Sequence, residues 1–202
     1  NLTIAAPMNE EEMRNAMYTA QLPDKGPFVI RYPRGRGEMP DWERPMKEVP
    51  VGKGRKVRDG KYLAVISIGT PGNMVSRALD TLVEKGVYPA HYDMRFLKPL
   101  DTRLLHEVFR KYQQVITIED GTITGGLGTA ILEFKNDHEY TAPVKRLGIP
   151  DRFVGQGTQQ ELYKECGYDE DAIKKEVLAR FPEECRVNAQ AHQHQHVQTG
   201  ND

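Results

Sequence analysis

Hydrophobic residues along the middle of the chain fall into two alternating patterns. Short apolar runs typical of buried strands are separated by stretches in which apolar residues recur every three or four positions, as on one face of a helix. The strand-like runs are residues 63–69, 88–93, 114–119 and 144–149, and helical stripes lie between them at 74–83, 104–109 and 130–134. Alternating strands and helices favour parallel pairing through right-handed crossovers. Residues 61–181 are therefore predicted to form an α/β domain, a small doubly wound and mostly parallel sheet with helices on both faces.

The pattern changes on both sides of this domain. Residues 1–34 hold a helix that Asn9 can cap and a short apolar run at 28–30, which indicates the end of a second, preceding α/β domain. Residues 35–60 are rich in proline, glycine and charge and are predicted to be a linker lying over a surface. Residues 182–202 show no periodicity, so a disordered tail is expected there.

Composition limits the function classes. The chain has 202 residues, 38% of them hydrophobic and 28% charged, which suits a packed core. A net charge of -1 gives no basic field that would favour nucleic acid. No apolar run approaches the roughly 20 residues that cross a bilayer. Two cysteines without metal-type spacing are expected to be reduced thiols of a cytoplasmic protein. The first residues resemble no signal peptide and include no initiator Met, so we expect the chain to start inside a longer protein.

One segment stands out for its chemistry. Arg31-Tyr32-Pro33-Arg34-Gly35 follows the strand-like run at 28–30 and places two guanidiniums beside an aromatic ring and a proline-restricted turn. The planar fork of arginine matches the geometry of phosphate and carboxylate. An oxyanion site is one interpretation, and a structural ion pair for one of the two arginines is the other.

Three further motifs have structural interpretations that we favour over functional ones. Gly125-Gly126-Leu127-Gly128 follows a strand but lacks the Gly-x-Gly-x-x-Gly spacing, so close packing at a helix N-terminus is preferred to nucleotide binding. Glu119 and Asp120 could be an acid–base pair, but adjacent acids at a strand end are more often solvated or paired to an arginine. Charges at Lys98 to Asp101 could bind an anion or fix a loop by ion pairing, and the loop-fixing interpretation is preferred.

The C-terminal histidines give the weakest signal. His192, His194 and His196 alternate with glutamine and could hold a transition metal, although no carboxylate or cysteine joins them. A polar tail without a site is the preferred interpretation. The chain contains no recognisable Ser-His-Asp triad, P-loop or zinc spacing. The residues alone therefore lead to a small α/β domain with a candidate anion site.

Taken in order, the segments of this chain resemble the 1-deoxy-D-xylulose-5-phosphate synthases, a family within the transketolases. The resemblance covers about residues 3–181, and its segments are Ala6-Pro7 with Asn9-Glu10, 31–35, 52–54, 69–70, Asp93 to Asp101, Glu119-Asp120 with 125–128, 147–153 and 156–159. The Arg-Tyr-Pro-Arg-Gly, Asp-Met-Arg-Phe-x-Lys-Pro-Leu-Asp and Gly-x-Pro-Asp segments are specific as a set. The glutamate with Gly-Gly-x-Gly is shared with transketolases and with beta subunits of two-oxo-acid dehydrogenases.

The resemblance implies an activity. Members of this family condense pyruvate with glyceraldehyde 3-phosphate, release carbon dioxide and form 1-deoxy-D-xylulose 5-phosphate, a precursor for isoprenoids, thiamine and pyridoxal. They use thiamine diphosphate and Mg²⁺, have three α/β domains and work as homodimers. On this basis residues 1–34 would end the central, pyrimidine-binding-type domain. Residues 61–181 would be the C-terminal domain, which in this family mainly packs and dimerises.

The resemblance also assigns site residues. Arg34 matches the family arginine that binds the phosphate of the aldehyde substrate, and Arg31 and Tyr32 look like support for that turn. No catalytic residue, cofactor ligand or metal ligand of the family is expected here, because its Gly-Asp-Gly motif, activating glutamate and proton-handling histidines are missing. The fragment alone is therefore expected to be inactive. The alternatives are another transketolase-family C-terminal domain, from a transketolase or a two-oxo-acid dehydrogenase beta subunit, or a free-standing dimerisation module.

Overall fold

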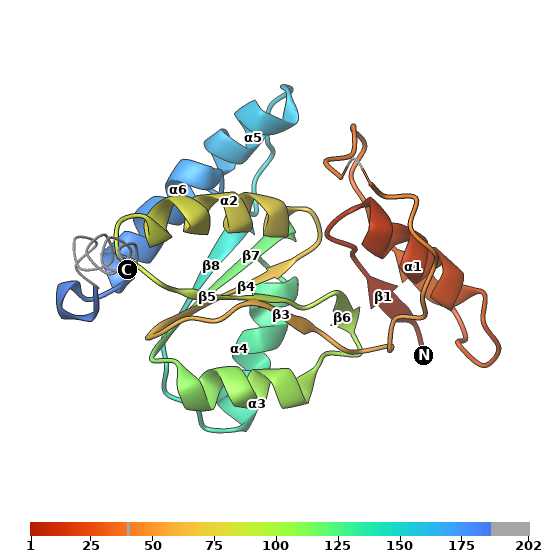
Figure 1. The fold of residues 1–202 in the computed structure, drawn as a ribbon, viewed down its shortest axis with the longest axis horizontal. Helices are drawn as coiled ribbons and strands as arrows, with labels where there is room; N and C mark the ends of the chain where they lie inside the picture. The colour runs from red at the N-terminus through yellow and green to blue at the C-terminus, as the bar shows by residue number, and fades with distance from the viewer. Residues whose placement is uncertain (40, 187–202) are drawn as a thin grey trace, which may run out of the picture.

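The computed structural model describes residues 1–39 and 41–186, which form two sheets (Figure 1). The three histidines of the predicted tail lie outside the described residues. The larger sheet has the strand order β3-β5-β4-β7-β8. Its strands are β3 (Arg55–Arg58), β4 (Leu63–Ile68), β5 (Ala90–Asp93), β7 (Gln114–Thr122) and β8 (Val144–Ile149). All neighbouring strands are parallel except β3, which runs antiparallel to β5 at the edge.

Helices cover both faces of this sheet, as Figure 1 shows. Helices α2 (Pro71–Val83) and α6 (Glu170–Arg180) pack on one face in a core that contains Leu79 and Val177. Helices α3 (Thr102–Lys111) and α4 (Leu127–Asp137) pack on the other face in a second core. The strands of the sheet centre are fully buried because they are covered on both sides. The predicted fold class is confirmed.

Two helices near the C-terminal end begin at local capping signals. Thr158 caps α5 (Gln159–Cys166) in a complete capping box with Glu161, and Gly167 ends this helix in a left-handed conformation. The side chain of Asp169 accepts a hydrogen bond from the Ala172 amide and so caps α6. These local signals fix where α5 begins, which matters for the site described below.

The N-terminal residues form a smaller sheet that also takes a strand from the second half of the chain. Strands β1 (Thr3–Ala5) and β2 (Phe28–Ile30) are parallel, and α1 (Glu10–Ala20), capped by Asn9, connects them. The third strand, β6 (Phe96–Lys98), pairs antiparallel with β1. The two predicted domains therefore share one sheet, while the boundaries between them remain a prediction.

Strands β1, β3 and β6 and the turn after α6 were not predicted from the sequence. Strand β3 lies inside the predicted linker, so the linker prediction is wrong at residues 55–58. Arg-Lys-Val-Arg lacks the apolar alternation of a strand, but an edge strand that pairs on one side only tolerates such charge. The predicted tail also begins too early, because Glu183–Cys185 form a 3-10 turn, η1, and Cys185 packs against the core under α2 and α6.

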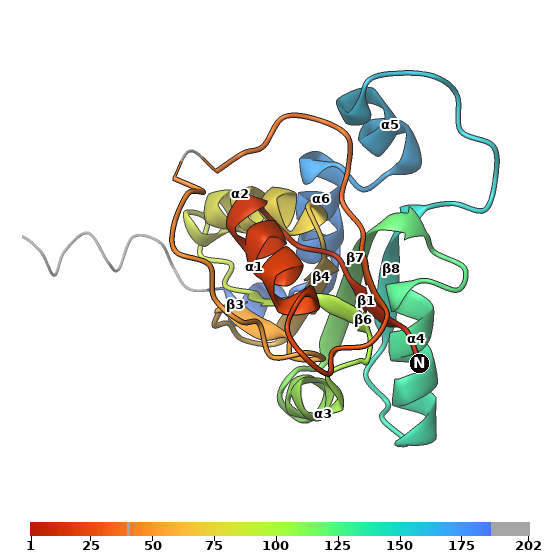
Figure 2. The ribbon, with the colours of Figure 1, turned by 90° about the vertical axis from the view of Figure 1, so that its right-hand side faces the viewer.

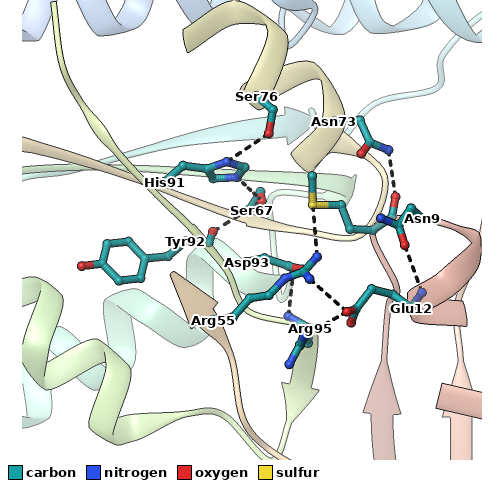
Figure 3. A network of polar contacts seen from close by, with 11 residues as sticks. Asn9, Glu12, Arg55, Ser67, Asn73, Ser76, His91, Tyr92, Asp93 and Arg95 are labelled. Atoms are coloured by element: carbon teal, nitrogen blue, oxygen red, sulfur yellow. Dashed lines mark hydrogen bonds and ion pairs between the residues drawn. The ribbon is translucent and has the colours of Figure 1, made fainter. Parts of the chain in front are cut away.

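A charged cluster joins the two sheets (Figure 3). The Glu12 carboxylate on α1 accepts hydrogen bonds from Arg55 at 3.0 Å and from Arg95 at 2.7 Å. Arg55 also donates to Asp93 at 3.2 Å, and the backbone amide of Arg95 donates to the same carboxylate at 3.1 Å. Arg95 has a left-handed backbone conformation (φ 56°). The contact of its side chain with Glu12 and that of its amide with Asp93 hold this conformation in place. We call these four residues the junction cluster.

Burial dominates the electrostatics of one member of the junction cluster. Asp93 is fully buried, and desolvation raises the pKa of its carboxyl from 3.8 to about 6. The nearby Arg55 guanidinium acts in the opposite direction but does not overcome the burial. Asp93 is therefore a carboxylate that depends on its arginine partner to remain charged near neutral pH.

We predict that Glu12→Ala lowers the free energy of unfolding by about 2–3 kcal/mol, because Arg55 and Arg95 lose their shared acceptor. Urea titration of the chain measures this loss. The matched control is Glu11→Ala, in the same helical turn, whose carboxylate makes only a 3.6 Å contact with the exposed Arg44. Its expected loss is at most about 1 kcal/mol. Equal losses in the two variants would contradict a special role for the cluster.

Candidate functional site

The Arg31–Gly35 turn begins directly after β2 and is largely exposed at a cleft between the two sheets. The cleft has a volume of about 910 Å³ and is lined by the N-terminal ends of α1, α2, α5 and α6 as well as by the turn. Figure 2 shows the chain that follows β2 running between α1 and α5. The cleft wall carries both signs of charge, because Glu10, Glu38, Asp169, Glu170 and Asp171 lie on it as well as Arg34, Arg36, Arg77 and Lys164. An anion would therefore be attracted at the arginine-bearing turn and not by the cavity as a whole.

Arg34 lines this cleft with an exposed side chain. Among the described residues, its guanidinium takes part in no salt bridge, and the same holds for Arg36 and Lys164 on the cleft wall. Arg77 differs, because it pairs with Glu38 at 2.7 Å and with Glu170 at 2.5 Å. Arg34 therefore has its charge and its donor fork available to a ligand, as the oxyanion interpretation requires.

The other two predicted site residues have different surroundings. The Arg31 guanidinium donates to the backbone carbonyl of Asp120, and the Arg31 amide donates to the Ala5 carbonyl at 2.8 Å. Tyr32 lines the cleft with 60% of its surface exposed. Arg31 makes the contacts of a residue that anchors the turn, whereas Tyr32 faces the cavity. Their roles in binding remain predictions.

Glu119 is a helix cap. It is buried, and its carboxylate accepts the amides of Leu127 at 2.8 Å and Gly128 at 2.9 Å, at the N-terminus of α4. A Cβ on Gly126 would lie 1.9 Å from this carboxylate, so the glycine permits the close approach. The glycine cluster does pack a helix N-terminus closely. The expectation that Glu119 is solvated or paired to an arginine is wrong, because helix amides satisfy it.

The remaining polar motifs are also satisfied internally. Asp120 accepts a hydrogen bond from the Tyr168 hydroxyl at 3.0 Å. Asp101 caps α3 through the Leu104 amide at 3.1 Å and accepts the Gly54 amide at 3.1 Å. The loop-fixing interpretation of this segment is therefore supported for Asp101.

Among the described residues, His91 contacts two serines that the sequence pattern does not link to it. The Ser67 hydroxyl lies 2.8 Å from His91 Nε2, and Ser76 lies 3.4 Å from His91 Nδ1 (Figure 3). Ser67 and His91 are 24 residues apart on β4 and β5, so only strand pairing brings them together. Both are fully buried, and a substrate could not reach the hydroxyl. Burial lowers the pKa of His91 from 6.5 to about 3, so the ring is neutral and structural.

In the described part of the chain, no three or more His, Cys, Asp or Glu side chains gather so as to hold a metal ion. Cys166 and Cys185 are free cysteines. In the same residues, none of the helices has the length and apolar character needed to span a bilayer.

Comparisons with known proteins agree on one family. Residues 52–173 match the family model described as the transketolase C-terminal domain. The 1-deoxy-D-xylulose-5-phosphate synthases of Bacteroides thetaiotaomicron and Cytophaga hutchinsonii are 64% and 56% identical over 88% of this chain. The chain spans only 28% of the length of each of them. A solved structure described as a split-gene transketolase, an inactive beta4 tetramer, has a TM-score of 0.77 at 29% identity, over 89% of this chain and 58% of that chain.

We predict a pH effect from His91. The folded state keeps this ring neutral down to about pH 3, whereas the unfolded state takes up a proton below about pH 6.5. The free energy of unfolding should therefore fall as pH is lowered through this window, and His91→Gln should remove this contribution. As pH is lowered through this window, the difference in free energy of unfolding between His91→Gln and the parent should change by up to about 1.4 kcal/mol for each pH unit.

Denaturant titrations between pH 4 and 7 measure this difference. The raised pKa of Asp93 acts with the opposite sign, because it removes stability as pH rises from 3.8 to about 6. Asp93 is present in both proteins, so its contribution cancels from the difference between them. The control is His138→Gln, at a partly exposed histidine on the far side of the sheet. Parallel profiles for the parent and His91→Gln would contradict the prediction.

Proposed function

The chain belongs to the transketolase C-terminal domain family, and from this premise we propose that it is part of a thiamine-diphosphate-dependent synthase. The proposed reaction condenses pyruvate with glyceraldehyde 3-phosphate, releases carbon dioxide and gives 1-deoxy-D-xylulose 5-phosphate. The names and the identity of the relatives support this choice within the family. The observation that carries it in the structure is Arg34, a cleft-lining guanidinium without a carboxylate partner among the described residues.

The chemistry of the substrate explains why such a residue is needed. The phosphate of glyceraldehyde 3-phosphate is retained in the product, so the enzyme must recognise it without reacting with it. A guanidinium does this through two parallel hydrogen bonds to phosphate oxygens and never loses its charge at physiological pH. Binding energy at the phosphate, remote from the reacting carbon, also helps to position the aldehyde.

The carbanion chemistry of this reaction is supplied by thiamine diphosphate when that cofactor is bound. Two observations support a cofactor site outside this chain: the sequence has no Gly-Asp-Gly motif, and no three His, Cys, Asp or Glu side chains gather among the described residues so as to hold a metal ion. We propose that thiamine diphosphate and its Mg²⁺ are held by other parts of a full-length synthase, and that this chain alone is inactive. Its own contribution is to recognise the phosphate and to hold the turn that does so.

A homodimer and a cytoplasmic location are part of the same proposal. A related transketolase is described as a tetramer of its split-gene beta chain, which supports self-association in this family. A transketolase is also the second candidate function, because its sugar-phosphate substrates would suit Arg34 as well. The donor substrate separates the two, since the synthase takes pyruvate and a transketolase takes a ketose phosphate.

We predict that Arg34→Ala, in the full-length synthase, raises the KM for glyceraldehyde 3-phosphate by about 10- to 100-fold. This range corresponds to the loss of a charge-assisted contact worth about 1.5–3 kcal/mol. The KM for pyruvate should change less than about twofold, because pyruvate carries no phosphate. Steady-state kinetics with each substrate varied in turn give both values.

The control for this experiment is Arg103→Ala, which removes an exposed arginine from α3 on the face of the sheet opposite α2 and α6. It should leave both constants unchanged. If Arg34→Ala raised both KM values equally, or neither of them, the phosphate role would be lost. Turnover with a ketose phosphate in place of pyruvate would favour the transketolase alternative.

A further inference from the structure

We propose that Gln159, the first residue of α5, is a positioning residue that sets the orientation of the Arg34 turn. The proposal rests on the phosphate role of Arg34 and extends it to the second half of the chain. The amide Nε2 of Gln159 donates a hydrogen bond to the backbone carbonyl of Arg34 at 3.0 Å. The two residues are 125 positions apart in sequence, so this contact exists only in the folded protein.

The capping box at the start of α5 fixes the backbone from which the Gln159 side chain extends. Thr158 accepts the amide of Glu161, and the Glu161 carboxylate accepts the amide and hydroxyl of Thr158, each at 2.8 Å. This capping box defines the start of α5 and so the origin of the Gln159 side chain. The other end of the same amide lies against the next residue of the turn, because a Cβ on Gly35 would be 3.3 Å from Gln159 Oε1. Gln159 thus spans the peptide between Arg34 and Gly35.

The rest of the turn is anchored on both sides of this peptide. At its start, Arg31 donates to the Asp120 carbonyl. After it, the Glu10 carboxylate accepts the amides of Glu38 at 2.8 Å and Met39 at 3.1 Å. Between these anchors, Gln159 makes the hydrogen bond to Arg34 itself. The direction in which the guanidinium leaves the backbone therefore depends on Gln159.

The expected size of the effect is modest, because the contact is exposed and uncharged. One neutral hydrogen bond of this kind corresponds to a change of about 3- to 10-fold in a binding constant. Gln159 does not touch the reacting atoms in this proposal. Its removal should therefore weaken recognition of the phosphate and leave the chemical step intact.

The test uses Gln159→Ala in the full-length synthase. We expect the KM for glyceraldehyde 3-phosphate to rise by about 3- to 10-fold, with the pyruvate KM and kcat unchanged. Turnover of unphosphorylated D-glyceraldehyde should also be unchanged, because it has no phosphate for Arg34 to hold. The matched control is Gln113→Ala, an exposed glutamine on the opposite side of the domain after α3. A loss of activity toward both aldehydes would indicate general damage and would overturn the proposal.

A double variant tests whether Gln159 acts through Arg34. Once Arg34 is replaced by alanine, adding Gln159→Ala should cost nothing further, since the residue being positioned is gone. Additive losses would overturn the proposal. If Arg34→Ala had no effect on the glyceraldehyde 3-phosphate KM, the proposed function itself would fail. If Arg34→Ala had its effect and Gln159→Ala had none, only the role of Gln159 would be lost.

Hydrogen exchange on this chain gives a measurement that does not depend on activity. Gln159→Ala should speed amide exchange within residues 31–39 and leave the exchange of β4 and β7 unchanged. Gln113→Ala should change neither. Unchanged exchange at residues 31–39 in Gln159→Ala would show that the turn is held without this contact, and the proposal would be overturned.

Discussion

The junction cluster of Glu12, Arg55, Asp93 and Arg95 holds the two sheets in one arrangement, and the cleft exists only in that arrangement. The Glu12 carboxylate from α1 meets guanidiniums from β3 and from the segment after β5. Asp93 is fully buried and would carry a large desolvation cost without Arg55. A partly buried charge cluster of this kind limits the geometry of the junction, since each carboxylate must keep its donors. The sharing of β6 with the smaller sheet makes the same connection through the backbone.

This arrangement also positions the residues of the proposed phosphate site. The Arg34 turn follows β2 of the smaller sheet, whereas its anchors at Asp120 and Gln159 belong to the larger domain. The proposed phosphate site would thus take contacts from both parts of the chain. Functional residues on a loop depend on a rigid scaffold for their geometry. In this proposal the larger domain affects substrate recognition without contacting the substrate.

Several polar motifs that suggested chemistry in the sequence serve the scaffold. Glu119 occupies the helix N-terminus that a phosphate would occupy in a nucleotide-binding loop, and Gly126 leaves the room for it. Ser67 and His91 resemble a nucleophile and its base, but burial keeps them from any substrate. Residue type and spacing identify such polar motifs in a sequence. Whether the same groups bind a ligand or cap a helix depends on the neighbours that the fold places around them.

Local patterns determined the four central strands and the helices of the larger domain, the caps at Asn9, Thr158 and Asp169 and the candidate turn at Arg31–Gly35, because hydrophobic periodicity and capping act within a few residues. They did not show strand β3, since a charged edge strand is decided by its neighbour β5. Nor did they show the partners of Glu12 and His91 or the hydrogen bond from Gln159 to the Arg34 carbonyl, which join positions between 15 and 125 residues apart. Contacts across such separations form only when the sheets pack, so tertiary structure alone decided which arginines of the described residues have carboxylate partners.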